Sequence, residues 1–61
     1  MKTREEILQK VERIKKENLL NEDRQKHFLK QKEFDKVKMY ERMITENEIK
    51  LDVLYWILDQ E

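Results

Sequence analysis

The spacing of apolar and amide side chains constrains the fold of this chain more than any other feature. Two ladders of such residues, one in each half, repeat at alternating intervals of four and three residues. This alternation is the heptad repeat of helices that pack along one narrow face. The first ladder is Ile7, Val11, Ile14, Asn18, Asn21, Gln25 and Phe28, and the second ladder is Val37, Tyr40, Ile44, Asn47, Leu51, Leu54 and Leu58.

The two ladders mirror each other about the middle of the chain. Numbers of opposed rungs always sum to 65, so that Ile7 would face Leu58. The nine-residue step from Phe28 to Val37 breaks the repeat. At ~100° per residue it would put the ladders on opposite faces of one continuous helix, whereas a reversal of the chain brings them together. We therefore predict an all-α fold, an antiparallel two-helix hairpin with a coiled-coil-like seam.

The expected boundaries follow from capping signals and from the break in the repeat. Thr3 and Glu6 match the capping box that begins many helices. A second break near Asn18–Asn21 would give three helices, although the first ladder runs through it in phase. We expect a single domain over residues 1–61, with helices over about 4–30 and 34–59 and a glycine-free turn over about 31–33.

The small size of the chain predicts self-association. A domain of 61 residues buries only about 60% of its unfolded surface, and such scaffolds usually need a disulfide, a metal or oligomerisation. The chain has no cysteine and one histidine, which leaves a homodimer of two hairpins, a four-helix bundle, as the expected form. Apolar residues outside the ladders are the candidate surface for this association or for another protein: Leu8, Leu19, Met43, Ile49, Val53, Trp56 and Ile57.

Charge is abundant and unevenly distributed. Charged residues make up 46% of the chain, and glycine and proline are absent, which is typical of long helices. Residues 1–31 carry nine basic and six acidic side chains, a net +3, whereas residues 32–61 carry five and eight, a net −3. Exposed ion pairs contribute only ~0.2–1 kcal/mol each, so this asymmetry favours the hairpin without determining it.

Amide side chains occupy the middle of both ladders. Asn18 falls on the same rung as Asn47, and a hydrogen-bonded pair there would fix the register of the helices. The alternative is a loosely packed, partly hydrated middle. We favour the register-setting interpretation because the two asparagines are opposed.

Basic residues near the turn suggest a second hypothesis, a nucleic-acid-associated regulator. Lys30, Lys32 and Lys36 are the candidate anion contacts. The chain as a whole is neutral, however, whereas nucleic-acid-binding domains are usually basic. A solvated charged surface is the simpler interpretation, and we do not expect nucleic acid as a partner.

Residues for catalysis are missing from the sequence. Serine and cysteine are absent, and His27 is the only imidazole, so no activated nucleophile is evident. We therefore expect no enzymatic activity, small-molecule substrate, cofactor or bound metal. The densest apolar stretch, Ile49–Leu58, is shorter than the ~20 residues of a membrane span, and the first 20 residues lack the apolar core of a signal peptide. These features favour a cytoplasmic protein that does not bind membranes.

The segment Lys32–Val37, followed by Tyr40–Glu41, Ile44 and the run Leu54–Leu58, resembles small helical-hairpin proteins encoded by phages and prophages of Gram-positive bacteria. The resemblance covers about half of the chain. It implies a small non-enzymatic protein that acts by binding, such as an inhibitor or adaptor for a larger protein. A purely structural oligomerisation element is the third hypothesis.

Overall fold

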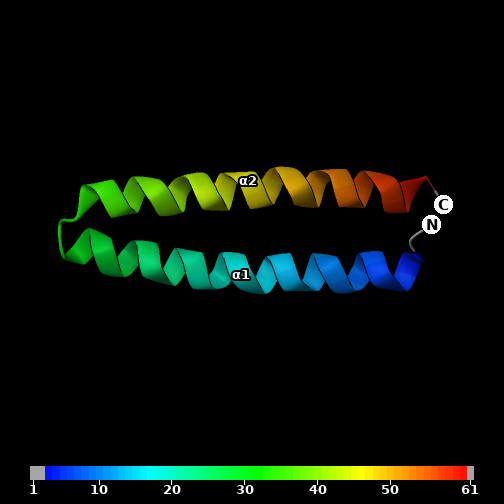
Figure 1. The fold of residues 1–61 in the computed structure, drawn as a ribbon, viewed down its shortest axis with the longest axis horizontal. Coiled ribbons are helices and arrows are strands. Elements are labelled where there is room, and N and C mark those ends of the chain that lie inside the picture. Colours follow the sequence, from blue (N-terminus) through cyan, green and yellow to red (C-terminus); the bar gives the residue numbers. More distant parts are fainter. Residues whose placement is uncertain (1–2, 61) are drawn as a thin grey trace.

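The computed structural model describes residues 3–60, which form two helices joined by a short turn (Figure 1). Helix α1 spans Arg4–Lys30 and helix α2 spans Phe34–Asp59. They lie side by side and antiparallel in a body of 45 × 15 × 15 Å. The predicted all-α hairpin is therefore confirmed. Residues 1–2 and 61 of the expected domain lie outside the described residues.

Helix α1 begins at its predicted cap and continues without interruption. The Thr3 hydroxyl accepts a hydrogen bond from the Glu6 backbone N–H at 3.2 Å, which satisfies one of the free donors of the first turn. The helix then runs unbroken through Asn18–Asn21, so the three-helix alternative is wrong. Neither helix, within residues 3–60, has the length and apolarity needed to cross a membrane.

The turn uses a lysine where glycine is the usual residue. Lys32 has φ of 58°, in the left-handed region. Its backbone N–H donates to the Leu29 carbonyl at 3.1 Å, and the Glu33 N–H donates to the Phe28 carbonyl at 3.0 Å. These two bonds are the pair of a Schellman motif, which ends a helix by satisfying its last carbonyls. The motif reverses the chain despite the cost of a Cβ atom in this conformation.

The ladders form the seam between the two helices, and the fully buried apolar side chains of the seam lie near the chain ends. Ile7, Val11, Ile14 and Leu58 are buried there, and Asn18, Asn21 and Asn47 are buried in the middle. The other seven ladder residues are half-buried: Gln25, Phe28, Val37, Tyr40, Ile44, Leu51 and Leu54. Every ladder position is thus at least partly covered.

Candidate interaction surfaces

Three asparagines form a polar layer in the middle of the seam. Asn47 Nδ2 donates to Asn18 Oδ1 at 2.7 Å, and Asn18 Nδ2 donates to the Ile44 carbonyl at 3.4 Å. This direct contact joins the two asparagines that the sequence places on one rung. Asn21 is only 2% exposed, and its Nδ2 has no hydrogen-bond partner among the described residues. The layer therefore contains one satisfied pair and one unsatisfied donor.

Contacts between the layer and the turn run diagonally across the seam. Gln25 Nε2 donates to the Val37 carbonyl at 3.5 Å. The rings of Phe28 and Tyr40 stack with their centroids 5.6 Å apart. The sequence predicts that Gln25 faces Tyr40 and that Phe28 faces Val37. The recorded contacts join each residue of α1 to a neighbour one step along α2, because long side chains reach diagonal positions.

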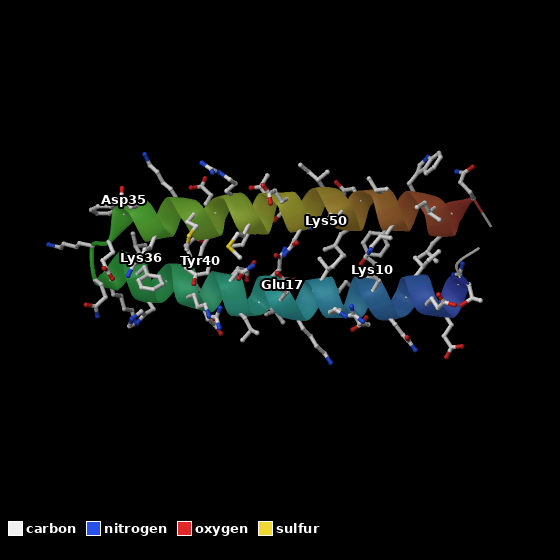
Figure 2. All side chains as sticks on the ribbon, viewed as in Figure 1. Lys10, Glu17, Asp35, Lys36, Tyr40 and Lys50 are labelled. Carbon is white, nitrogen blue, oxygen red and sulfur yellow. The ribbon has the colours of Figure 1, made fainter. Side chains whose placement is uncertain are left out.

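Two of the three basic residues near the turn line one groove. Lys32 and Lys36 border this groove of about 340 Å³ together with two acidic side chains. Lys36 Nζ lies 4.8 Å from the centroid of the Phe28 ring and 3.4 Å from Glu33 Oε1. This ammonium is therefore engaged by groups of the hairpin itself (Figure 2). Lys30 and Lys32 lie on exposed surface. Of the three candidate anion contacts, Lys36 is thus the one with local partners for its charge.

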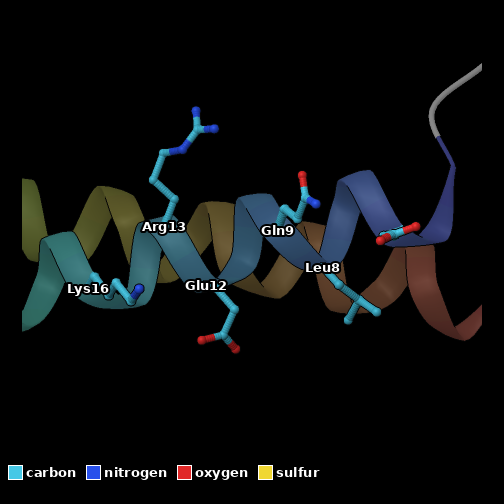
Figure 3. Close-up of a pocket in the computed structure, with 6 residues that line it drawn as sticks. Leu8, Gln9, Glu12, Arg13 and Lys16 are labelled. Carbon is cyan, nitrogen blue, oxygen red and sulfur yellow. The ribbon is translucent and has the colours of Figure 1, made fainter.

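The outer face of α1 is mostly charged. A groove of about 460 Å³ lies on it, and all of its lining residues come from this one helix (Figure 3). Arg13 and Gln9 extend along one side of the groove, and Glu12 and Leu8 extend along the other. Among the described residues of the lining, Leu8 is the only one with an apolar side chain.

The outer face of α2 is apolar over its last three turns. We call Ile49, Val53, Trp56 and Ile57 the α2 apolar face. Trp56 is 63% exposed and Val53 is 52% exposed, so the hairpin leaves these side chains in water. Their spacing of four, three and one residues places them within about 100° of arc on the helix.

Other members of the predicted interface lie elsewhere. Leu8 and Leu19 are exposed on α1, with Leu19 at 62%. Met43 is half-buried, because it flanks the seam. We therefore count Met43 with the covered side chains of the hairpin and not with its outer surface. The exposed Phe34 was not among the predicted interface residues, since it lies at the start of α2 and outside both ladders.

A groove between the helices borders the α2 apolar face. It has a volume of about 300 Å³ and is lined by Lys10 of α1 and by Ile49, Lys50, Val53 and Leu54 of α2. Figure 2 labels the two lysines, one on each helix. We call this the interhelix groove. It joins an apolar floor to two cationic side chains, and its edge is shared with the α2 apolar face.

One cross-helix contact has no counterpart in the sequence analysis. Lys15 Nζ lies 5.7 Å from the centroid of the Tyr55 ring. A hydrogen bond with Tyr55, and then the charge interaction with it, raises the pKa of Lys15 above its usual value. Both residues sit beside the ladders, where antiparallel helices bring flanking positions together. The positions of Lys15 and Tyr55 next to the ladder residues are the sequence signal from which this contact could have been predicted.

No group of three or more metal-binding side chains lies close enough to hold an ion within the described part of the chain. A comparison of the chain with protein families, with curated proteins and with solved structures finds no match. The similarity to phage and prophage hairpins thus stays a prediction. Any functional interpretation has to come from the surfaces described above.

Proposed function

We propose that this chain is a small, non-enzymatic protein-interaction module that self-associates. The observation that carries the proposal is the imbalance between exposed and buried apolar side chains. Among residues 3–60, eleven large apolar side chains are exposed, whereas four apolar side chains are buried. A two-helix hairpin can cover one stripe per helix, and the remaining apolar area is of the kind that marks interaction sites.

The dimensions of the hairpin support the same proposal. Its accessible surface is 5281 Å². A monomer of 7.7 kDa is expected to expose only about 4,300 Å². Its radius of gyration is 14.1 Å, against about 10.5 Å for a compact domain of this length. The excess of roughly 1,000 Å² is close to what each partner buries in a standard protein interface, about 800 Å².

Within this proposal, the module acts as an adaptor or as an inhibitor of a larger protein. The α2 apolar face supports binding because it contains an exposed tryptophan, a residue enriched among the anchors of protein interfaces. The resemblance to phage and prophage hairpins is in line with an inhibitory role. Neither argument depends on a catalytic group.

Affinity capture from the source cell with three forms of the protein tests the proposal. Trp56→Ala removes the anchor, and Leu19→Ala is the matched control because the two side chains are almost equally exposed. We expect wild type and Leu19→Ala to retain the same partner and Trp56→Ala to lose it, as measured by quantitative mass spectrometry. Identical recovery by all three forms would contradict binding through α2. If none of the three retains a partner, the module serves only as an oligomerisation element.

A further inference from the structure

We propose that the interhelix groove binds an amphipathic helix of the partner protein, whose apolar stripe is flanked by aspartate or glutamate. This inference rests on the proposed function and adds the chemistry of the partner at one surface of the module. Three observations on the described residues carry it: the composition of the groove, the difference in charge between the two flanks of the hairpin and the absence of a sheet edge.

The groove combines apolar side chains with two cations. Ile49, Val53 and Leu54 are the apolar residues, and Lys10 and Lys50 border them from the two helices. Among residues 3–60, neither ammonium group forms an ion pair. A partner that inserts an apolar side chain and places a carboxylate beside it would meet complementary groups. Hydrogen bonds between an ammonium group and a carboxylate are roughly twice as strong as those between neutral groups.

The two flanks of the hairpin differ in charge near the chain ends. Heptad positions assign residues to a flank, and the Lys15–Tyr55 contact and the interhelix groove each identify one of them. The flank of Lys15 also carries five carboxylates: Glu5, Glu12, Glu48, Asp52 and Asp59. The flank of the groove carries three cations and three carboxylates: Lys10, Arg13, Lys50, Glu6, Glu17 and Glu46. An acidic helix is thus repelled from the first flank but not from the second.

The carboxylates on the groove flank restrict where the acidic residues of the partner can lie. The described lining of the groove contains no carboxylate. Glu6 accepts a hydrogen bond from the Thr3 hydroxyl at the start of α1. Glu17 and Glu46 lie nearer the turn than either groove lysine, as Figure 2 shows for Glu17. The acidic residues of the partner are therefore expected at the level of the two lysines, because farther toward the turn they would meet like charges.

The form of the partner follows from the backbone of the hairpin. Residues 3–60 contain no β-strand, so they offer no sheet edge to which an extended peptide could add. An apolar groove can instead bind the apolar stripe of another helix. A flat anionic membrane is a poorer match. Asp52 and Asp59 lie one turn from Trp56, so they would face any membrane that Trp56 contacts. One helix in the groove avoids both carboxylates.

Selection from a displayed library of helical peptides tests the inference directly. Each peptide carries leucine at positions i, i+3, i+4 and i+7, with glutamate, glutamine or lysine at random beside this stripe. Wild type should enrich glutamate over lysine at least about threefold at the flanking positions. The double variant Lys10→Glu, Lys50→Glu should enrich lysine instead. Its matched control, Lys16→Glu, Lys38→Glu, has the same net charge, also changes exposed residues and should enrich glutamate as wild type does.

Affinities for the peptide that wild type enriches most provide a second measurement. Fluorescence anisotropy of the labelled peptide should give a Kd at least about tenfold weaker for Lys10→Glu, Lys50→Glu than for Lys16→Glu, Lys38→Glu. Circular dichroism should show both variants to be as helical as wild type, because all four lysines are exposed. Phosphatidylglycerol vesicles, which represent an anionic membrane, should not sediment wild type.

The outcomes distinguish this inference from the proposed function. No enriched peptide, no preference for glutamate, or a preference that Lys10→Glu, Lys50→Glu leaves unchanged overturns the acidic helix. Sedimentation of wild type with the vesicles also overturns it, in favour of a membrane surface. If capture from the source cell requires Trp56 but neither lysine, the interaction module stands and only the acidic helix fails. If the two substitutions reverse the preference, the assigned chemistry of the groove stands whether or not a cellular partner is captured.

Discussion

The two ends of the hairpin differ in what fills the space between the helices. At the open end, where α1 begins and α2 ends, Ile7, Val11, Ile14 and Leu58 form a small buried apolar core. From Asn18 to the turn, the seam contains amides and half-buried side chains. The open end therefore supplies most of the apolar burial, which is the main favourable term in folding.

The polar half contributes specificity more than stability. Asn18 and Asn47 satisfy each other only when the helices are in one register, because a shift by one heptad would separate them. Asn21 adds a cost, since a buried donor without a partner is destabilising. In this hairpin, apolar burial at the open end supplies stability, and the asparagine pair in the polar half fixes the register of the two helices.

The largest expected effect comes from weakening the open end. Ile14→Ala should reduce the free energy of unfolding by about 2–4 kcal/mol, because it removes a buried side chain and leaves a cavity. Ile44→Ala, in the polar half, should cost clearly less because Ile44 is only half-buried. Urea denaturation followed by circular dichroism measures both. Equal losses at the two positions would remove the distinction between the ends.

Removing the unsatisfied donor should strengthen the polar half. Asn21→Leu should raise the free energy of unfolding by about 1–3 kcal/mol, since no hydrogen bond is lost and the residue is buried. Asn18→Leu is the matched control, and it should lower stability because it leaves the Asn47 amide without its partner. The same urea titration would contradict this account if both variants were destabilised.

Relieving the turn should give a smaller gain. Lys32→Gly should stabilise the hairpin by about 1 kcal/mol, because glycine tolerates positive φ without steric cost. Lys26→Gly is a suitable control, as it places glycine at an exposed position inside α1 and should destabilise by a similar amount. A destabilised Lys32→Gly variant, measured by thermal unfolding, would show that φ at this position is not positive in solution.

The smallest effect concerns the flank of the open end. The contact with Tyr55 raises the pKa of Lys15, so the protonated amine is favoured in the folded state. The associated stability is present below the usual lysine pKa and is lost as the pH rises through the raised value. Tyr55→Phe should return the Lys15 pKa toward its usual value in an NMR titration of the lysine side chain. An unchanged titration would exclude the hydroxyl as the cause.

The sequence predicted the hairpin because heptad spacing and a phase break are strong signals for helix packing. The Asn18–Asn47 pair could also be predicted, because the numbers of opposed ladder residues always sum to 65. The extent of burial could not be predicted from the sequence. Asn21 and Ile44 are opposed ladder residues, yet Asn21 is buried and Ile44 is only half-buried. Long flanking side chains such as Lys15 and Met43 have several rotamers, so their contacts depend on geometry that spacing does not specify.

The half-turn offset between the two ladders has a consequence for any chain that fails to reverse at Lys32. A straightened chain would carry one apolar stripe on each of two opposite sides. Each stripe could recruit a different neighbour, and no two such rods could satisfy both of their stripes on each other. The product would be an open-ended filament instead of a closed exchange dimer. The bend at Lys32 thereby protects the chain against polymerisation.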